Sequence, residues 1–189
     1  MQVKNYLTKI FFCSFSTRFD STLMWSHYAK DHSGFCIEYD VGENLDFKNN
    51  LFPVFYQKEL FKLDREILKN SKEKLSLYIS NALLHKSTDW KYENEWRYIQ
   101  IGQPLNNAKN IKAPKINKII LGSRFFESFK INQEKRDSEY YERKARALEL
   151  INHCENFNVE IDIIKHSSAN YSLDRNSISS DDCRILLND

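Results

Sequence analysis

The stretch from Asp89 to Ile99 constrains the fold of this chain more than any other, because it packs two Trp, two Tyr, two Glu and one Arg into eleven residues. Side chains alternate between the two faces of a β-strand. A strand entered by a short turn would therefore place Glu93, Glu95 and Arg97 on one face. The sequence predicts that this face is charged and that the other carries Asn94, Trp96 and Tyr98.

The charged face has two interpretations. In the structural one, Glu95 and Arg97 neutralise each other beside a core that Trp96 anchors. In the functional one, a carboxylate held by an arginine beside aromatic rings forms a polar site in an apolar wall, where a charge can take part in chemistry. The residues leave both interpretations open.

Length and charge restrict the class of protein. A chain of 189 residues fits one domain and can bury a substantial core. With 28 basic and 26 acidic residues the net charge is +2, which favours neither nucleic acid nor a membrane as partner. The basic stretch from Lys109 to Lys118 lacks interleaved aromatic residues and gives nucleic acid little support. With no apolar run of about 18 residues and no signal peptide within residues 1–17, we expect a cytoplasmic protein.

The cysteines and glycines exclude several kinds of site. The four cysteines have no paired close spacing, so we expect free thiols and neither a zinc site nor a redox pair. The four glycines form no glycine-rich phosphate loop, which argues against P-loop and Rossmann chemistry. We predict no metal site and no bound cofactor. The cysteines are Cys13, Cys36, Cys154 and Cys183.

Hydrophobic patterns predict a single α/β domain of the α+β type over residues 1–165, with a mixed or antiparallel central sheet and flanking helices. The first forty residues are interpreted as a β-α-β unit. Residues 166–189 are predicted to be a polar, loosely ordered tail, apart from strand pairing at 185–187. Strands are expected at 9–16, 34–40, 54–56, 118–122 and 159–164, and helices over 22–29, 59–85 (one or two) and 139–157.

Four motifs occur together along the chain: Met-Trp-Ser-His-Tyr-Ala at 24–29, Gly-Phe-Cys-Ile-Glu-Tyr-Asp at 34–40, Trp-Lys-Tyr-Glu-Asn-Glu-Trp-Arg at 90–97, and Ile-Ile-Leu-Gly at 119–122. This combination is similar to the bacterial family called domain of unknown function 2971 and covers most of residues 10–165. The resemblance implies a mixed α/β domain found in mobile or defence-associated settings. Family members carry an upstream segment, so we expect this chain to be shortened at its N-terminus.

The pair Glu93-x-Glu95 resembles the acidic motif of ADP-ribosyltransferase folds. That chemistry needs a carboxylate that grips a ribose hydroxyl next to the breaking bond and favours an oxocarbenium-like transition state. The resemblance assigns the gripping role to Glu95, a partner role to Glu93 and an orienting role to Arg97. NAD is the candidate substrate.

The same hypothesis needs an aromatic wall for nicotinamide and a polar anchor for the dinucleotide. Trp25, Tyr28 and Trp96 are the candidate aromatic residues, and Ser26 or His27 is the candidate anchor. Core packing also explains Trp25 and Tyr28, and an ordinary helix histidine also explains His27. We expect Trp25, Tyr28 and Trp96 to be mostly buried.

The sequence thus supports two functional hypotheses from different classes. The first is an NAD-using, ADP-ribosyltransferase-like or nucleotide-processing enzyme centred on Glu95 and Arg97, which should lie close together. The second is a non-catalytic interaction or sensor domain of a defence or toxin system, in which the ion pair is structural and the protein partner is unidentified.

Overall fold

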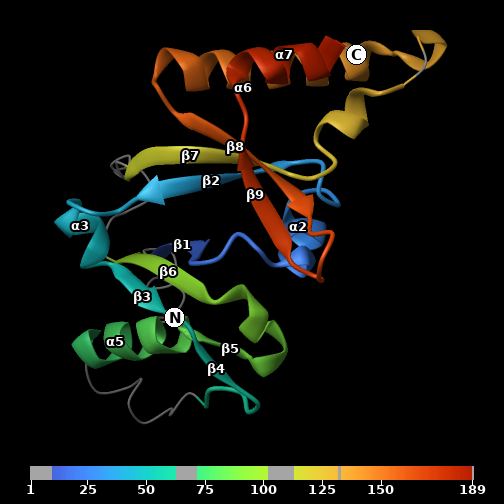
Figure 1. Ribbon diagram of the computed structural model, residues 1–189. Coiled ribbons are helices and arrows are strands. Elements are labelled where there is room, and N and C mark those ends of the chain that lie inside the picture. Colours follow the sequence, from blue (N-terminus) through green and yellow to red (C-terminus); the bar gives the residue numbers. More distant parts are fainter. Residues whose placement is uncertain (1–9, 63–71, 102–112, 132, 189) are drawn as a thin grey trace. The chain divides into compact units, whose positions relative to one another are not determined.

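The computed structural model describes residues 10–62, 72–101, 113–131 and 133–188 (Figure 1). The described residues form helices together with antiparallel and mixed sheets, which confirms the predicted α+β class. The packing divides the chain into two compact units. The first unit comprises residues 1–18 and 41–114, and the second unit comprises residues 19–40 and 115–189.

The sheet of the first unit is centred on the strand that the sequence singled out. Within the described residues, β6 (Glu95–Ile101) lies between β1 (Ile10–Ser16) and β3 (Leu51–Pro53) and is antiparallel to both. One face of this sheet is aromatic. The rings of Phe47 and Tyr98 stack with centroids 4.7 Å apart, and Phe15 meets Phe47 edge-on at 5.4 Å. Phe47 comes from the short helix α3 (Leu45–Lys48). Packing on this face fixes which side chains of β6 point the other way.

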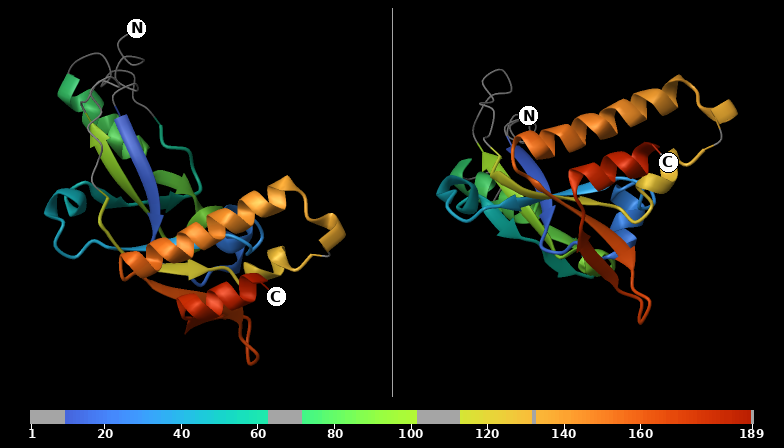
Figure 2. Two further views of the ribbon diagram at one scale, coloured as in Figure 1. Left: turned by 90° about the horizontal axis from the view of Figure 1, so that it is seen from above. Right: turned by 45° about the horizontal axis from the view of Figure 1, so that its top comes forward.

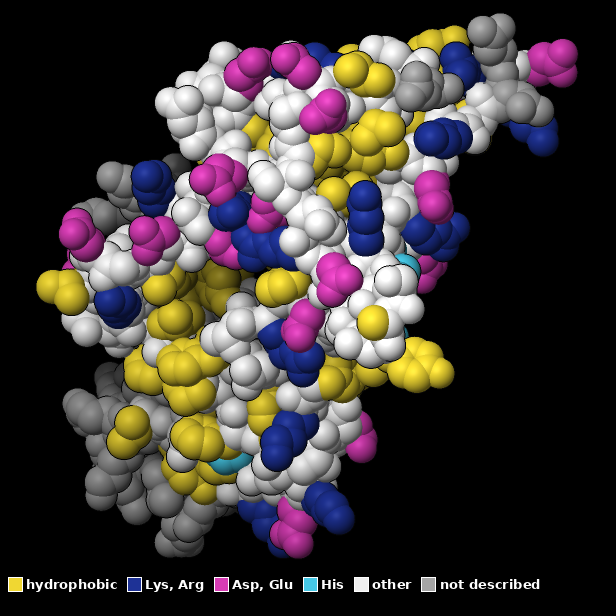
Figure 3. All heavy atoms as spheres, in the orientation of Figure 1, with side chains coloured by type: hydrophobic (Ala, Val, Ile, Leu, Met, Phe, Trp, Pro, Cys, Tyr) yellow, Lys and Arg dark blue, Asp and Glu magenta, His cyan; other side chains and the backbone are white. Residues whose placement is uncertain are grey.

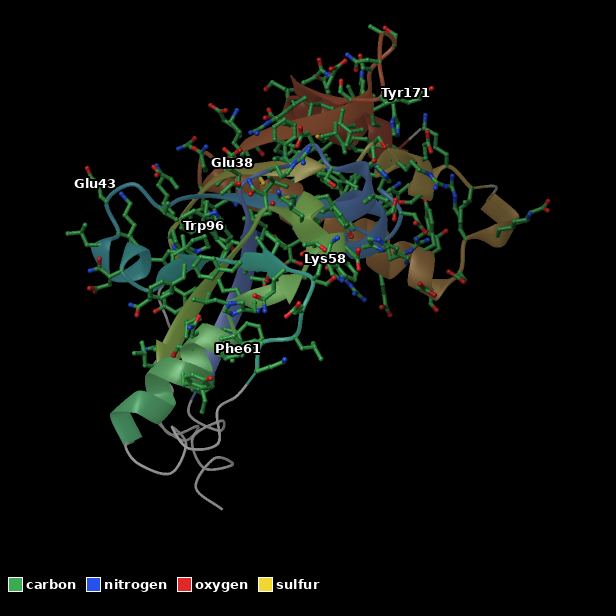
Figure 4. The ribbon with its side chains drawn as sticks, turned by 90° about the horizontal axis from the view of Figure 1, so that it is seen from below. Glu38, Glu43, Lys58, Phe61, Trp96 and Tyr171 are labelled. Atoms are coloured by element: carbon green, nitrogen blue, oxygen red, sulfur yellow. The ribbon has the colours of Figure 1, made fainter. Side chains whose placement is uncertain are left out.

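The first unit also contains the helix α5 (Lys72–Ala82) and two short strands, β4 (Phe55–Gln57) and β5 (His85–Ser87). These two strands pair in parallel. Phe61 packs between Tyr78 of α5 and His85, with ring centroids 5.3 and 4.6 Å away (Figure 4). The predicted helical stretch 59–85 therefore contains α5, while its residues 63–71 lie outside the described residues.

A 3-10 helix, η1 (Thr88–Glu93), precedes β6. Asn94 caps this helix, and its φ of 48° is left-handed. The strand therefore begins at Glu95, and the prediction that Glu93 belongs to it was wrong. Asparagine tolerates the left-handed conformation because its short amide can bond locally. Asn94 Nδ2 donates to Thr17 Oγ1 at 2.5 Å. This turn redirects the chain immediately before the charged residues.

The second unit contains a mixed sheet in the order β2-β7-β8-β9, counted over the described residues. Only the β7–β8 pair is parallel, which confirms the predicted mixed sheet. A parallel pair needs a crossover, which α6 (Ser138–Asn156) supplies. The strands are β2 (Phe35–Asp40), β7 (Lys115–Leu121), β8 (Glu160–His166) and β9 (Leu173–Ser177).

Helices cover both faces of this sheet. Figures 1 and 2 show α6 and α7 (Ser180–Asn188) side by side on one face, where Tyr140, Ile151 and Leu187 are at most 2% exposed. On the other face, Trp25 of α2 (Thr22–Tyr28) packs with Ile120 of β7. The 3-10 helices η3 (Phe126–Phe129) and η4 (Gln133–Lys135) connect β7 to α6.

Two predictions about topology were wrong. The expected β-α-β unit does not form, because β1 and β2 belong to different sheets. The expected loose tail contains β9 and α7, so β8 is not the last strand and residues 185–187 are helical. Cys183 and Leu187 lie four apart, on one side of a helix, and both are buried, which explains why this polar stretch folds. Tyr171, at the end of the β8–β9 loop, is fully exposed (Figure 4).

The structure describes all four cysteines, and each is a free thiol, as predicted. Burial raises the pKa of Cys183 to about 11, so this thiol is neutral at physiological pH. Among the described residues, no helix combines the length and the apolar character that crossing a membrane requires.

Candidate functional site

The charged face of the first unit's sheet is formed by β1 and β6. Ser14 lies opposite Arg97 in the antiparallel register, and Ser16 lies opposite Glu95. Directly opposed residues share a face, so Ser14, Ser16, Glu95 and Arg97 are presented together. The sequence prediction that Glu95 and Arg97 lie side by side is confirmed.

Glu95 is the centre of the cluster and is 5% exposed. Among the described residues, four side-chain hydrogen bonds reach its two carboxylate oxygens. Arg97 donates from Nε to Oε1 at 2.7 Å and from Nη2 to Oε2 at 3.1 Å. Ser14 Oγ donates to Oε1 at 2.5 Å, and Lys86 Nζ donates to Oε2 at 2.9 Å. The backbone N–H of Glu95 donates to Tyr56 Oη at 2.8 Å. Because Arg97 bonds both carboxylate oxygens, it fixes the plane of the carboxylate.

Glu93 reaches the same place by another route. It ends η1, is 4% exposed and accepts a short hydrogen bond from Lys86 Nζ. Lys86 therefore bridges both carboxylates from β5. Ser16 Oγ donates to the Glu93 carbonyl at 2.6 Å and ties η1 to β1. The sequence placed Glu93 beside Glu95 by strand alternation; the structure brings them together through the 3-10 helix and Lys86.

Protonation in the cluster is set by burial opposed by hydrogen bonding. Burial raises the pKa of Glu95, but the hydrogen bonds from Arg97, Ser14 and Lys86 outweigh it and lower the pKa to about 2. Burial lowers the pKa of Lys86, and its bonds to Glu93 and Glu95 more than reverse this, so the pKa is raised. A carboxylate with a pKa near 2 stays ionised at neutral pH, so Glu95 cannot act there as a general acid. Its chemistry is that of an anion and a hydrogen-bond acceptor.

Two aromatic rings that the sequence analysis did not select flank the cations. The Phe12 ring, 52% exposed, lies 5.6 Å from Arg97 Cζ, and the Trp90 ring, 37% exposed, lies 5.0 Å from Lys86 Nζ. Ser14 is also exposed. Strand alternation could have identified Phe12 and Ser14, because they share a face two residues apart. No local pattern marks Lys86, since parallel pairing with β4 places it.

Four of the five predicted dinucleotide-binding residues belong to the second unit. Trp25, Ser26, His27 and Tyr28 all belong to α2 in the second unit, whereas the Glu95 cluster belongs to the first. Trp25 is buried, as predicted, and its indole Nε1 donates to the Phe19 carbonyl at 2.5 Å. The prediction of burial was wrong for Tyr28, which is 65% exposed and meets His27 edge-on with ring centroids 6.3 Å apart. Core packing thus explains Trp25 and not Tyr28.

Trp96 is partly buried, as predicted, but it points away from Glu95. It is opposed by Phe15 across the β1–β6 pair and so belongs to the aromatic face (Figure 4). Ser26 Oγ donates to the Thr22 carbonyl at 3.1 Å and lies 3.4 Å from His32 Nε2.

A second ion cluster, in the second unit, resembles the first in charge. Asp162 is 3% exposed and accepts a short bond from Arg175 Nε, while Lys118 Nζ lies 3.4 Å away. Arg175 also bonds Glu38 at 2.7 Å, and this hydrogen bond lowers the pKa of Glu38 (Figure 4). Buried carboxylates held by one arginine and one lysine therefore occur twice among the described residues. Asp162 is a natural control for Glu95.

The surface gives nucleic acid little support. On the face seen in Figure 3, Lys and Arg side chains are interspersed with Asp and Glu. Lys118, at the end of the basic stretch, is bound by Glu160 at 2.6 Å, and Lys109 and Lys112 lie outside the described residues. Within the described chain, no three His, Cys, Asp or Glu side chains are placed to hold a metal ion.

Residues 24–98 match the model of the family described as Protein of unknown function (DUF2971). The match confirms the resemblance inferred from the sequence for this stretch, which contains α2 from Met24 onward and the cluster residues Lys86, Glu93, Glu95 and Arg97. It is shorter than the stretch of residues 10–165 over which the resemblance was drawn. No curated protein and no solved structure matches the chain.

Proposed function

For this chain, whose residues 24–98 carry the DUF2971 match, we propose that the Glu95 cluster binds a ribose-containing nucleotide and that the reaction is ADP-ribosyl transfer from NAD. One observation carries the proposal. Glu95 is a buried, ionised carboxylate that already accepts a hydroxyl hydrogen bond, from Ser14 Oγ at 2.5 Å. A ribose hydroxyl offers the same donor group.

The chemistry matches what an ionised acceptor can do. When the bond between the ribose anomeric carbon and nicotinamide breaks, nicotinamide leaves with the electron pair and the sugar becomes cationic. A fixed carboxylate beside that sugar stabilises the developing charge without giving up or taking a proton. An acceptor nucleophile then bonds to the anomeric carbon and passes its proton to solvent, which completes the transfer. In the proposal Glu95 accepts from the ribose hydroxyl in place of Ser14, Arg97 keeps the carboxylate oriented, and Lys86 holds Glu93 against it.

The surroundings of Glu95 support a ring-bearing ligand. Phe12 and Trp90 are exposed beside Arg97 and Lys86, so both could stack with a base or with nicotinamide. Ser14 is exposed and has one rotatable side-chain bond, so a ligand hydroxyl can displace it for the loss of one charge-assisted hydrogen bond. Such a bond contributes about 1.5–3 kcal/mol, which is within reach of nucleotide binding energy.

The alternative is a non-catalytic interaction or sensor domain of a defence or toxin system. Saturation of the carboxylate favours it, because the chain's own donors reach both oxygens of Glu95. The similar arrangement around Asp162 also favours it. In this case the cluster holds η1, β1, β5 and β6 in register and binds no nucleotide.

Binding of NAD, followed by isothermal titration calorimetry, tests the proposal. We expect wild type to bind NAD and the change Glu95→Gln to weaken binding by about tenfold or more, because a charge-assisted bond to ribose is lost. The matched control Asp162→Asn, a buried carboxylate in a similar ion cluster, should leave affinity within about twofold.

A further variant tests the displacement of Ser14. Ser14→Ala removes the competing donor, so NAD should bind equally well or more tightly than to wild type. Failure of wild type to bind NAD, or equal weakening by Glu95→Gln and Asp162→Asn, would contradict the proposal and favour the interaction domain.

A further inference from the structure

His32 is held in the second unit by an unusual backbone. Lys30, Asp31 and His32 have φ values of 48°, 51° and 66°, so three successive non-glycine residues are left-handed. Such residues cost free energy and persist where the surrounding structure holds them. The turn is held by Arg124 N–H, which donates to the His32 carbonyl at 3.0 Å, and by Gly122, where a Cβ would lie 2.0 Å from that carbonyl oxygen.

The imidazole of His32 is 8% exposed but surrounded by polar groups. Ser26 Oγ lies 3.4 Å from Nε2, and Ser123 Oγ lies 3.4 Å from Nδ1. The ring is stacked on Trp25 with centroids 6.3 Å apart, and its centroid is 5.5 Å from that of His166. Apolar packing alone therefore does not account for His32, because each of its ring nitrogens lies near a serine hydroxyl.

His166 connects this buried ring to a cavity. It ends β8, is exposed, and lines a cavity of about 520 Å³ together with Thr22 and the β8–β9 loop. None of the seven lining residues, all of them described, carries a carboxylate. Five of them carry a hydroxyl or an amide: Thr22, Ser167, Ser168, Asn170 and Tyr171.

Hydrogen bonds inside the loop leave donors for a ligand. Ser167 Oγ accepts from the Ala169 N–H at 3.3 Å, so its hydroxyl hydrogen points elsewhere. Asn170 Oδ1 accepts from the N–H of Ser172 at 2.9 Å and from its hydroxyl at 2.5 Å, so the amide group of Asn170 can donate. A donor-rich cavity with a histidine at its edge suits an anion.

We propose that this cavity binds the phosphate group of a small molecule, with His166 as the contacting imidazole and Ser167, Ser168 and Asn170 as neutral donors. The buried ring of His32 packs beside the ring of His166. The cavity is open to solvent, and its volume of about 520 Å³ leaves room for more than the phosphate itself. The inference uses residues of the second unit only and does not rest on the function proposed for the Glu95 cluster.

Charge around His32 makes the binding depend on pH. Burial, and then the charge of His166, lowers the pKa of His32; Arg124 acts in the same direction, and Asp31 and the Thr22 carbonyl oppose it. An anion in the cavity offsets the charge of His166 and so favours the charged form of His32. Binding should therefore strengthen as pH falls.

Titration with sulfate, followed through the imidazole proton resonances, tests the proposal, because the charge of sulfate is the same at pH 6 and pH 8. We expect saturable shifts at His166 and His32, with binding several-fold tighter at pH 6. His166→Gln should weaken binding about tenfold. The matched control His153→Gln removes an exposed imidazole of α6 that stacks on Phe157, away from the cavity, and should leave binding unchanged.

Two further titrations, with inorganic phosphate and with AMP, distinguish the sources of the phosphate. Tighter binding of AMP identifies a phosphate ester as the ligand, and equal binding identifies phosphate itself; either result supports the site. Shifts that do not saturate, or equal weakening by His166→Gln and His153→Gln, would overturn it. His166 is exposed, so its replacement should leave the thermal unfolding midpoint unchanged.

Discussion

Glu95 receives its hydrogen bonds from parts of the chain that are far apart in sequence. Ser14 comes from β1, Lys86 from β5, and Arg97 from two residues along β6. Removing one partner from a buried ion cluster leaves the others without compensation, which costs far more than losing a surface pair. The protonation state of this single carboxylate should therefore influence the stability of the chain.

Acid unfolding should reveal that influence. Glu95 has a folded pKa of about 2 against an ordinary value of 4.5, so its contribution is present above about pH 4.5 and is lost as pH falls toward 2. We expect this contribution to be about 3 kcal/mol. Between these pH values the stability of wild type should fall more steeply than that of Glu95→Gln, measured by urea unfolding. Parallel curves for the two proteins would contradict the assignment.

At the scale of elements, α7 shows how weak sequence signals combine into a packed helix. Its first turn carries Asp181 and Asp182, whose negative charges suit the positive end of a helix. It buries Cys183 and Leu187. Arg184 bonds Glu155 of α6 and donates to Asn152 Oδ1 at 3.0 Å, which secures α7 along α6. This stretch is short and polar, so its sequence does not predict a helix. The helix depends on tertiary contacts instead.

A pair of truncations within α7 tests its packing. Leu187→Ala removes a side chain that is 2% exposed and should lower the free energy of unfolding by about 2–5 kcal/mol. Ile185→Ala, on the same helix but 58% exposed, should change it by less than about 0.5 kcal/mol. Thermal and chemical unfolding measure both. Similar effects of the two changes would show that α7 does not pack as described.

At the scale of the whole molecule, local patterns predicted elements better than their partners. Apolar runs identified β1 and β7, alternation identified β2 and β8, a capping residue identified α2 and an apolar side identified α6, because these signals lie within a few neighbouring residues. The pairing of β1 with β6 brings Ser14 to Glu95 across 81 positions, and no periodicity encodes such a contact. For the same reason, local patterns did not predict how the described strands divide among three sheets.

The sequence predicted the two residues at the centre of the candidate site but not the residues around them. Glu95 and Arg97 lie two apart on one strand, so alternation alone placed them together. Lys86 enters through the parallel β4–β5 pair and lies beside Trp90, whereas Phe12 meets Arg97 through the pairing of β1 with β6. The residues chosen for a nucleotide wall on α2 belong to the other unit.

The central claim is that the Glu95 carboxylate stabilises a sugar cation and does more than hold the fold. Release of nicotinamide from NAD, measured under single-turnover conditions for wild type, Glu95→Gln and Asp162→Asn, tests it most directly. We predict that wild type releases nicotinamide, that Glu95→Gln slows release by about 100-fold or more while remaining folded, and that Asp162→Asn stays within a few-fold of wild type. No release by wild type, or unchanged release by folded Glu95→Gln, would contradict the claim.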